Sequence, residues 1–550
     1  MSADKQFEKL QNEMFERFYQ ILPEIATMLG LHDPFDHQLS KGDLTPELEI
    51  EKLIEKTIQR MKDTIDFNAL NDTNKIDWQV LERTQKLLKF IIREQRQSVL
   101  NPDGFDLIAG SFFLMISKDY ASLEERMKGI ISRLKEVARY LEEFRTRFEK
   151  SKPVKLWTEI AFETAQTIPG LFQFIAMFGK GQISNELQAD LDDAIAELEI
   201  PLKEHLAWLQ KLQSNTIDDW ALGKERFEKL IQLRGLGMTS EEILQFGIQS
   251  LKELKEERTQ IAAQIDPNKT VGEVMTMIEE DTPETYDEAL LATRTAMEEA
   301  KQFILDNDLA TVYEEDKLII EETPPYMVPL IPFAALMPPS RFDDPKIGIY
   351  VVTRPKNMTN LSKHLNNPSI RNVAVHESYP GHFLQGSASN RGSLLQNLST
   401  LATNLGLETV EGWAHYCEQM MMEKGFVKGL EAKMVQLTGA IWRAVRIITD
   451  VQLSRGEMTF DEAVNMLVTE TGMSKESAVA EVRRYTLTPG YPLSYLLGKQ
   501  LILQLRDEIK QKMGNQYSDK FFHDTIAANG FLPVSLLRKV FEQNIAKLKS

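Results

Sequence analysis

The segment from His376 to His382 reads His-Glu-Ser-Tyr-Pro-Gly-His and holds the residue types that metal catalysis requires. A second acidic segment begins further along the chain, at Glu411. Neutral imidazoles and a carboxylate are the usual ligands of a catalytic zinc ion, which keeps one position open for water. A glutamate directly after the first ligand is the usual general base for that water, and Glu377 stands there. The pattern predicts a metal-dependent hydrolase, and in the first place a peptidase.

The two histidines are six positions apart, whereas the helix of an ordinary zinc peptidase carries its two histidines four positions apart. Six positions on a regular helix correspond to about 600° of rotation and about 9 Å of rise, so the side chains would leave on different faces. Both nitrogens must lie about 2.0–2.1 Å from one zinc ion, which a straight helix does not allow. Pro380 lacks the N–H that would bond the carbonyl of His376, and Gly381 can adopt backbone angles closed to other residues. We therefore expect the helix to kink or end near Tyr379.

The identity of the third ligand stays open on spacing alone. Glu411 is a candidate, but it could also be an ordinary surface residue of a helix. His415 lies one helical turn beyond Glu411 and competes for the same role. Cys417 could bind metal too, although a lone buried thiol is the more ordinary interpretation. Histidines without acidic or histidine partners nearby are interpreted as structural or surface residues: His32, His37, His205 and His364.

Helical signals dominate the chain from end to end, and they predict a mainly α fold. Thr45 and Pro46 mark the start of a helix that is expected to run to about Phe67. A cap residue and a glutamate three positions later form a capping box, which marks other helix starts. Further starts are predicted at the capping boxes 239–242 and 459–462, at Thr282-Pro283, and at Ser474.

Short β-type runs separated by prolines lie just ahead of the histidine segment, at residues 318–320, 326–328 and 347–352. An edge strand beside the metal could bind an extended peptide by backbone pairing, or the strands could simply brace the core. The expected architecture is a large, two-lobed, multi-helix fold with a small β-sheet beside the metal site. We place a helical N-terminal lobe or lid at residues 1–308 and a catalytic lobe at 309–550.

Composition narrows the class of protein and of partner. The chain has 550 residues, 64 of them basic and 82 acidic, so its formal net charge is −18. Nucleic acids and anionic membranes attract positive surfaces, so this charge disfavours both as partners. The expected partner is the peptide substrate that the histidine segment suggests. A single cysteine excludes an internal disulfide framework, and the first residues hold no apolar run of a secretory signal. We therefore expect a cytoplasmic protein, while its oligomeric state stays open.

Two motifs together are specific for a known family. His-Glu-x-x-Pro-Gly-His is followed by Gln385, and Glu-Gly-Trp-Ala-x-Tyr-x-Glu runs from Glu411 to Glu418. With these motifs the sequence resembles the family called domain of unknown function 885. That family looks like zincin-type metallopeptidases and is distantly similar to thimet-type oligopeptidases and helical carboxypeptidases. Shorter matches cover nearly the whole chain: residues 23–32, Pro338-Pro339, Arg484-Tyr485, Pro489-Gly490, Ser494-Tyr495, Gly498-Lys499 and residues 522–524.

The resemblance implies a zincin-like fold and a specific set of site residues. His376, His382 and Glu411 would hold one zinc ion, and Glu377 would be the general base. The resemblance also disfavours His415 as a ligand, because the family does not require histidine there. The implied activity is zinc-dependent hydrolysis of short peptides, of the carboxypeptidase, dipeptidase or oligopeptidase type.

The sequence departs from the family pattern at two places. Tyr491 and Pro492 stand where the family often has glutamine and alanine, and Ser454 stands where it often has histidine. If that histidine assists catalysis or substrate binding, this protein manages otherwise and its specificity differs.

The chemistry of peptide hydrolysis asks for further groups around the metal. Tyr485 or Tyr495 is expected to donate a hydrogen bond to the oxyanion, and simple aromatic packing is the alternative for each. Arg484 could bind the terminal carboxylate of a substrate in a two-point fork, or it could be an exposed structural arginine. Asp450 or Glu408 is a candidate to orient a ligand histidine.

Two other functions stay open from the sequence. The same ligands could hydrolyse a non-peptide amide. Alternatively, the chain could be a catalytically inactive helical protein that binds peptides and keeps metal only for structure. The intact Glu377 argues against the inactive protein, because a purely structural metal site needs no base.

Overall fold

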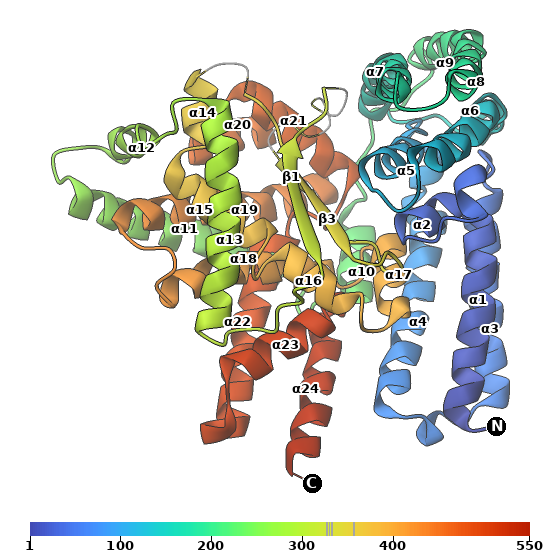
Figure 1. Ribbon diagram of the computed structural model, residues 1–550. Helices are drawn as coiled ribbons and strands as arrows, with labels where there is room; N and C mark the ends of the chain where they lie inside the picture. The colour runs from blue at the N-terminus through green and yellow to red at the C-terminus, as the bar shows by residue number, and fades with distance from the viewer. Residues whose placement is uncertain (326–327, 329–330, 332–333, 356–357, 550) are drawn as a thin grey trace. The chain divides into compact units, whose positions relative to one another are not determined.

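The computed structural model describes residues 1–549 with the exception of 326–327, 329–330, 332–333 and 356–357 (Figure 1). The chain is mainly α-helical with one small sheet, which confirms the predicted fold class. Its internal contacts divide it into two compact units, Met1–Trp220 with Ser340–Asp344 and Ala221–Pro339 with Pro345–Ser550. This division follows Trp220, whereas the approximate lobe boundary predicted from the sequence lies at residue 308. Among the described residues, no helix is long and apolar enough to cross a membrane.

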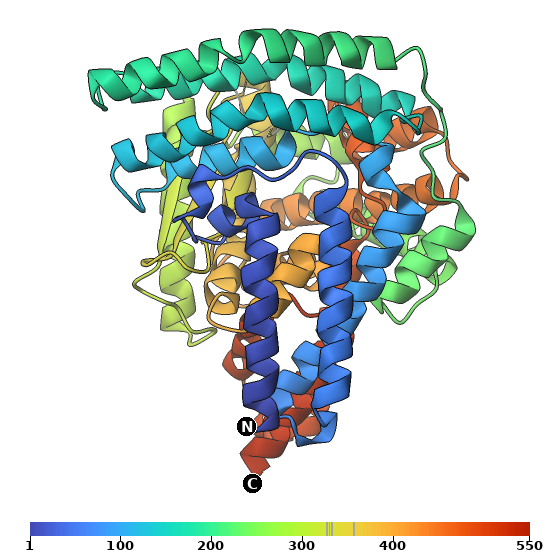
Figure 2. The same cartoon turned by 90° about the vertical axis from the view of Figure 1, so that its right-hand side faces the viewer.

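The first unit consists of amphipathic helices that bury one face each. Along α1 the buried side chains recur at helical spacing, as at Phe7, Leu10 and Met14. Helices α1, α3 and α4 run side by side, and α6, α7 and α9 lie across one end of them (Figure 2). The helices of this unit are α1 Ala3–Ile21, α2 Pro23–Met28, α3 Thr45–Thr64, α4 Asp72–Phe90, α5 Asp106–Ser117, α6 Leu123–Arg145, α7 Lys155–Gly179, α8 Asn185–Ala196 and α9 Glu199–Leu212.

The second unit carries every residue that the sequence singles out for chemistry, together with the sheet. The most extensive helix–helix contacts in this unit are those of α11 with α19 and of α18 with α22. Its helices are α10 Lys224–Arg234, α11 Ser240–Ile265, α12 Val271–Glu279, α13 Tyr286–Asp306, α14 Met358–His364, α15 Asn367–Glu377, α16 His382–Ser389, α17 Leu394–Thr403, α18 Leu407–Glu423, α19 Leu430–Arg455, α20 Phe460–Thr471, α21 Lys475–Leu487, α22 Ser494–Met513, α23 Asp519–Ala528 and α24 Val534–Lys549.

The helix starts follow their local capping chemistry. The capping boxes at Thr239 and Thr459 and the cap at Ser474 are confirmed. The start predicted at Thr282-Pro283 is wrong, because Thr285 forms a complete capping box with Glu288 and α13 begins after it. Two reciprocal hydrogen bonds to otherwise unpaired backbone N–H groups outweigh the preference of proline for the first helical position.

The sheet has the strand order β1-β3-β2, with β1 Lys317–Glu322, β2 Ala334–Met337 and β3 Ile347–Val352. Strand β3 pairs parallel with β1 and antiparallel with β2. Two of the three predicted runs are confirmed as β1 and β3, while the third begins at 326–327, outside the described residues. Buried side chains of β3 form one core with α13 and α15, so the sheet braces the helix that carries His376 (Figure 1).

Candidate metal centre

The predicted break between the two histidines is confirmed. Helix α15 ends at Glu377 and α16 begins at His382. The peptide bond between Tyr379 and Pro380 is cis. Gly381 donates its backbone N–H to the carbonyl of Val375 at 3.1 Å, which folds the chain back against the end of α15. A second short helix therefore starts with His382 close to His376.

Glycine is needed at position 381 for a different reason from the one the sequence suggested. Its φ is −68°, outside the left-handed region that favours glycine. A Cβ atom there would overlap the carbonyl oxygen of His376 and crowd that of Val375. The break therefore depends on a close backbone approach that only glycine permits.

His376, His382 and Glu411 come together in space, and the donor atoms of the three side chains all lie within 4.8 Å of one another. The two imidazole rings are 4.8 Å apart and nearly perpendicular, at 89°. Nε2 of His382 lies 3.5 Å from Oε2 of Glu411. An ion at about 2.0–2.2 Å from each donor would need only a small contraction of this arrangement. Two nitrogens and one carboxylate oxygen suit zinc, so these residues fit the ion that the family resemblance implies.

Helix α18 positions Glu411 and also holds the turn between the histidines. Trp413 donates its indole N–H to the carbonyl of Pro380 at 2.8 Å. Helix α18 crosses α22 so closely that a Cβ at Gly412 would overlap the backbone of Gly498. The glycine in the Glu-Gly-Trp motif thus allows the crossing that fixes Glu411, and the tryptophan ties the same helix to the proline turn.

Glu418 orients the first candidate ligand. Nδ1 of His376 donates to Oε1 of Glu418 at 2.7 Å, which leaves Nε2 free to face a metal. Asn372 and Arg443 donate to the same carboxylate, each at 3.0 Å. This role was not predicted from the sequence, although Glu418 lies seven residues after Glu411 and thus on nearly the same helix face.

The prediction that Asp450 or Glu408 orients a ligand histidine is wrong. Glu408 is ion-paired with the buried Arg234 at 3.0 Å. Asp450 accepts the backbone N–H groups of Gly490 and Leu493 at 2.9 and 3.0 Å. Both carboxyl groups stabilise the loop that leads into α22 instead, because Arg234 also donates to the carbonyl of Gly490.

The buried carboxylates of the site are held in their ionised form. Burial raises the pKa of Glu411, but the hydrogen bond and charge of His382 outweigh it and lower the pKa to about 2. Burial likewise opposes ionisation of Glu418, and the charge of Arg443 nevertheless holds its pKa well below the usual range. Ligands must be deprotonated to bind metal, so this electrostatic setting suits a cation.

Glu377 stands at the end of α15 with a free carboxylate. Within the described part of the chain it has no hydrogen-bond partner, and it is only half-buried. It lies near enough to His382 and to Tyr350 of β3 for its charge to raise the pKa of both groups. A carboxylate beside the ligands and without a fixed partner is able to take up a proton.

Tyr491 is a site residue that the sequence analysis noted only as a departure from the family. Its hydroxyl donates to Oε1 of Glu411 at 2.6 Å. The ring of Tyr495, one of the two predicted oxyanion donors, lies 6.0 Å from that of Tyr491. The hydroxyl of the other predicted donor, Tyr485, donates to Glu481 and accepts from Arg446, so the structure places it in a neighbouring charged cluster.

The chain matches the family described as "Bacterial protein of unknown function (DUF885)" over residues 23–540. It belongs to this family. No curated protein matches the chain. Its fold is shared by solved structures, including the following two. A "putative lipoprotein of unknown function" from Shewanella oneidensis has 21% identity and a TM-score of 0.77, with 97% of this chain and 99% of that chain covered. A "putative lipoprotein" from Colwellia psychrerythraea has 18% identity and a TM-score of 0.83, with both chains fully covered.

In this member of DUF885 the two rival ligands stay outside the cluster of donor atoms. His415 is fully buried, and burial lowers its pKa to about 3, which keeps the ring neutral. Cys417 is also buried, and burial raises the pKa of its thiol well above the usual value. Among the described residues, only Glu411 joins His376 and His382.

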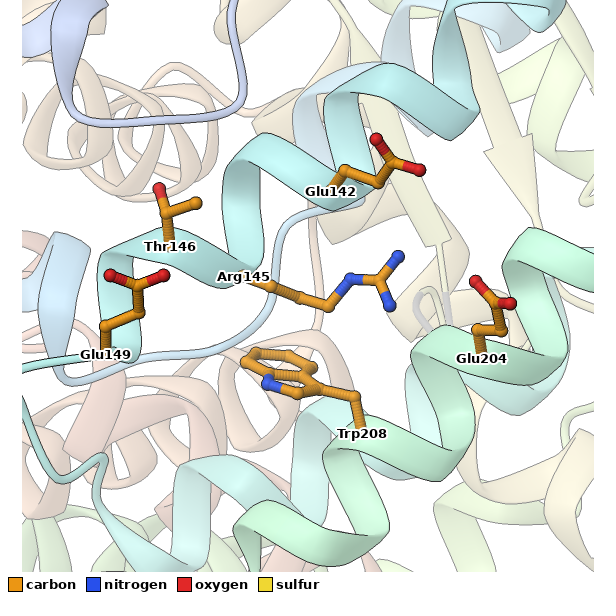
Figure 3. Close-up of a pocket in the computed structure, with 6 residues that line it drawn as sticks. All are labelled: Glu142, Arg145, Thr146, Glu149, Glu204 and Trp208. Atoms are coloured by element: carbon orange, nitrogen blue, oxygen red, sulfur yellow. The ribbon is translucent and has the colours of Figure 1, made fainter.

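A cavity of about 370 Å³ belongs to the first unit and has a different character (Figure 3). The guanidinium of Arg145 extends over the indole of Trp208, with carboxylates around it (Figure 3). None of the metal-site residues lines this cavity, whose walls are Glu142, Arg145, Thr146, Glu149, Glu204 and Trp208.

Proposed function

We propose that this protein is a zinc-dependent metallopeptidase that hydrolyses short peptides. The observation that carries the proposal is the meeting of His376, His382 and Glu411 within 4.8 Å. The carboxylate of Glu377 lies beside them and has no hydrogen-bond partner among the residues that the structure describes. A structural metal site would have no use for a free base next to its ligands. The three proposed ligands lie on three helices, α15, α16 and α18, and the proline-broken turn between α15 and α16 brings the two histidines together.

In the proposed mechanism, Glu377, Tyr495 and Glu418 have different roles in hydrolysis. A bound zinc ion would supply a water of lowered pKa and a positive charge for the carbonyl oxygen of the substrate. Glu377 takes the proton of the attacking water on its carboxylate and then passes it to the departing amine. Tyr495 is the predicted donor to the oxyanion, while Glu418 holds the imidazole of His376 in the tautomer that presents Nε2.

A peptide is the substrate that the surroundings of the site favour. Strand β2 pairs with β3 on one side only, among the strands that the structure describes. A free strand edge can bind an extended peptide through its backbone groups. Because β3 packs with the helix that carries His376, such a peptide would lie in the same part of the unit as the ligands.

The decisive experiment combines metal analysis with a base variant. We expect about one zinc ion per chain, loss of peptide hydrolysis on chelation and recovery when zinc is added back. Glu377→Gln should keep the zinc and lose about 10²- to 10⁴-fold in kcat, because only the proton acceptor is removed. The exposed Glu256→Gln, on α11, is the matched control and should leave kcat unchanged.

The same assay decides among the other functions. Equal turnover by Glu377→Gln and the parent protein would remove the base from the mechanism. Hydrolysis of simple amides without hydrolysis of peptides would assign a non-peptide substrate. Zinc binding with no hydrolysis of either class would make the protein a metal-stabilised binder.

The proposed location is the cytoplasm, and it rests on the single buried cysteine and the acidic composition. The word lipoprotein describes the two solved relatives alone. Fractionation of the native cells, with the protein followed by antibody, tests the proposal. Recovery in the membrane fraction would overturn it.

A further inference from the structure

A cluster of two arginines and one carboxylate lies beside the metal centre. Arg446 of α19 and Arg484 of α21 each donate to Oε2 of Glu481 at 2.9 Å. Tyr485 donates to the same oxygen at 2.7 Å. One carboxylate therefore neutralises only one of two guanidinium groups, and the cluster keeps one positive charge in excess.

Only one tyrosine side chain separates this cluster from the metal ligand Glu411. The guanidinium of Arg484 lies 5.7 Å from the ring centre of Tyr491, whose hydroxyl is bonded to Glu411. The guanidinium of Arg446 lies 4.6 Å from the ring centre of Tyr495. A substrate whose scissile bond lies at the proposed metal site could therefore contact the positive charge of the arginine cluster.

Arg484 has donors to spare for a ligand. Its side chain is 38% exposed, and within the described part of the chain only one of its three nitrogens has a hydrogen-bond partner. Arg446 is much less accessible, at 6% side-chain exposure, and Arg443 is committed to Glu418. A planar guanidinium with two free N–H directions matches a carboxylate in a two-point fork.

We propose that Arg484, supported by Arg446, binds the C-terminal carboxylate of a peptide, so that the enzyme removes one or two residues from the C-terminus. This inference rests on the proposed peptidase function and names its substrate class. An extended peptide advances roughly 3.3–3.6 Å per residue, so the length of a tyrosine side chain corresponds to one or two residues between the scissile bond and the terminus. In a chain of net charge −18, a local positive charge also concentrates anionic ligands at this place.

Binding to a variant that does not cleave tests the carboxylate site without relying on turnover. The zinc-loaded Glu377→Gln protein is titrated calorimetrically with N-acetyl-trialanine, with its C-terminal amide, and with an amide that ends in glutamate. We expect the free acid to bind about 10- to 100-fold more tightly than either amide, because a charge-assisted pair is lost in both. Binding of the glutamate amide as tightly as the free acid would overturn the proposal, since a side-chain carboxylate would then suffice.

An arginine substitution then links the preference to its residue. In the Glu377→Gln protein, the further substitution Arg484→Met should reduce the preference for the free acid over the amide to about threefold or less. Arg484→Lys in its place should retain part of the preference. Arg538→Met is the matched control, because Arg538 is 39% exposed and is also ion-paired with one glutamate, Glu508. The control should keep the full preference, and thermal unfolding should show that all variants are folded.

The two proposals fail in different ways. If the parent enzyme cleaves the acid and the amide alike, and both bind alike, the carboxylate site is overturned while the peptidase stands. If the acid binds preferentially through Arg484 but no peptide is cleaved, the carboxylate site stands and the peptidase is overturned. Release of one or two C-terminal residues, identified by mass spectrometry, supports both.

Discussion

Among individual residues, Tyr491 links the proposed metal ligand Glu411 to the arginine cluster. The phenol donates to Glu411 at 2.6 Å while its ring faces Arg484 on the other side. The Tyr491 side chain thus orients Glu411 and lies between Glu411 and the arginine cluster.

Tyr491→Phe removes the hydroxyl and keeps the ring. We expect zinc affinity to fall about 10-fold, because ligand carboxylates lose affinity when their hydrogen-bonded partner is removed. Competition with a chromophoric chelator measures the change. Tyr517→Phe is the control, since Tyr517 also donates to a carboxylate, that of Asp519, at 3.1 Å. Equal zinc affinity in the parent and the Tyr491→Phe protein would contradict the role given to this hydroxyl.

The residues at the site divide into those that the sequence could predict and those that it could not. His376 and His382 were within reach of sequence reasoning, because their types, their spacing and the proline between them form one local pattern. Spacing alone left Glu411 and His415 open as third ligand, and only the packing of α18 against the proline turn separates them. The role of Glu418 depends on donors from α15 and α19, which are distant in the chain.

Among the elements, the break between α15 and α16 determines whether the proposed metal ligands His376 and His382 can meet. Its geometry rests on the close approach of Gly381 to the carbonyl of His376. The cap at Asn366, which accepts from Ser369, and the packing of α15 against α13 and β3 keep the first helix in place.

Gly381→Ala should therefore damage both stability and metal binding. The added methyl group overlaps backbone, which cannot move as a side chain would, so we expect a loss of about 1–3 kcal/mol in the free energy of unfolding. Zinc content should fall, because His382 is displaced. Gly170→Ala on α7 is the control: no atom lies within 4 Å of the added group, and alanine favours a helix by about 0.5–1 kcal/mol over glycine. Full zinc content in the Gly381→Ala protein would show that the turn tolerates a side chain.

Helices and strands that depend on interactions between residues close in the chain could be predicted from the sequence, and those that depend on distant residues could not. The capping boxes at Thr239 and Thr459 were predictable because each involves residues three positions apart. Strand β2 was not predicted, since it lies in an apolar stretch interrupted by prolines and without alternation. Its existence depends on pairing with β3, whose residues are further along the chain.

For the whole molecule, the fold is retained at low sequence identity. Structures with 18% and 21% identity have TM-scores of 0.83 and 0.77, so this architecture does not require a closely similar sequence. The division into two units after Trp220 has no matching signal in composition or in a linker of unusual sequence. The division arises from which helices pack together. Contacts between residues that are distant in the chain cannot be predicted from the local sequence.

The stability of the whole protein should carry a pH dependence from Asp450, the carboxyl group that holds the loop before α22. Burial raises its pKa from 3.8 to about 7, even though two backbone N–H groups oppose that shift. The folded state then binds the proton more tightly than the unfolded state. Its stabilising contribution is complete below about pH 4 and is lost as the pH rises towards 7, above which both states are deprotonated.

Asp450→Asn replaces the titrating group by a neutral one of the same shape and removes this dependence. Relative to the variant, the parent protein should lose up to about 1.4 kcal/mol of unfolding free energy per pH unit between pH 5 and 7. Thermal or urea unfolding of both proteins without zinc, at each pH, gives the difference and cancels the titration of all other groups. A difference in stability that stays constant from pH 5 to 7 would mean that Asp450 is ionised throughout, and that the N–H groups of Gly490 and Leu493 outweigh its burial.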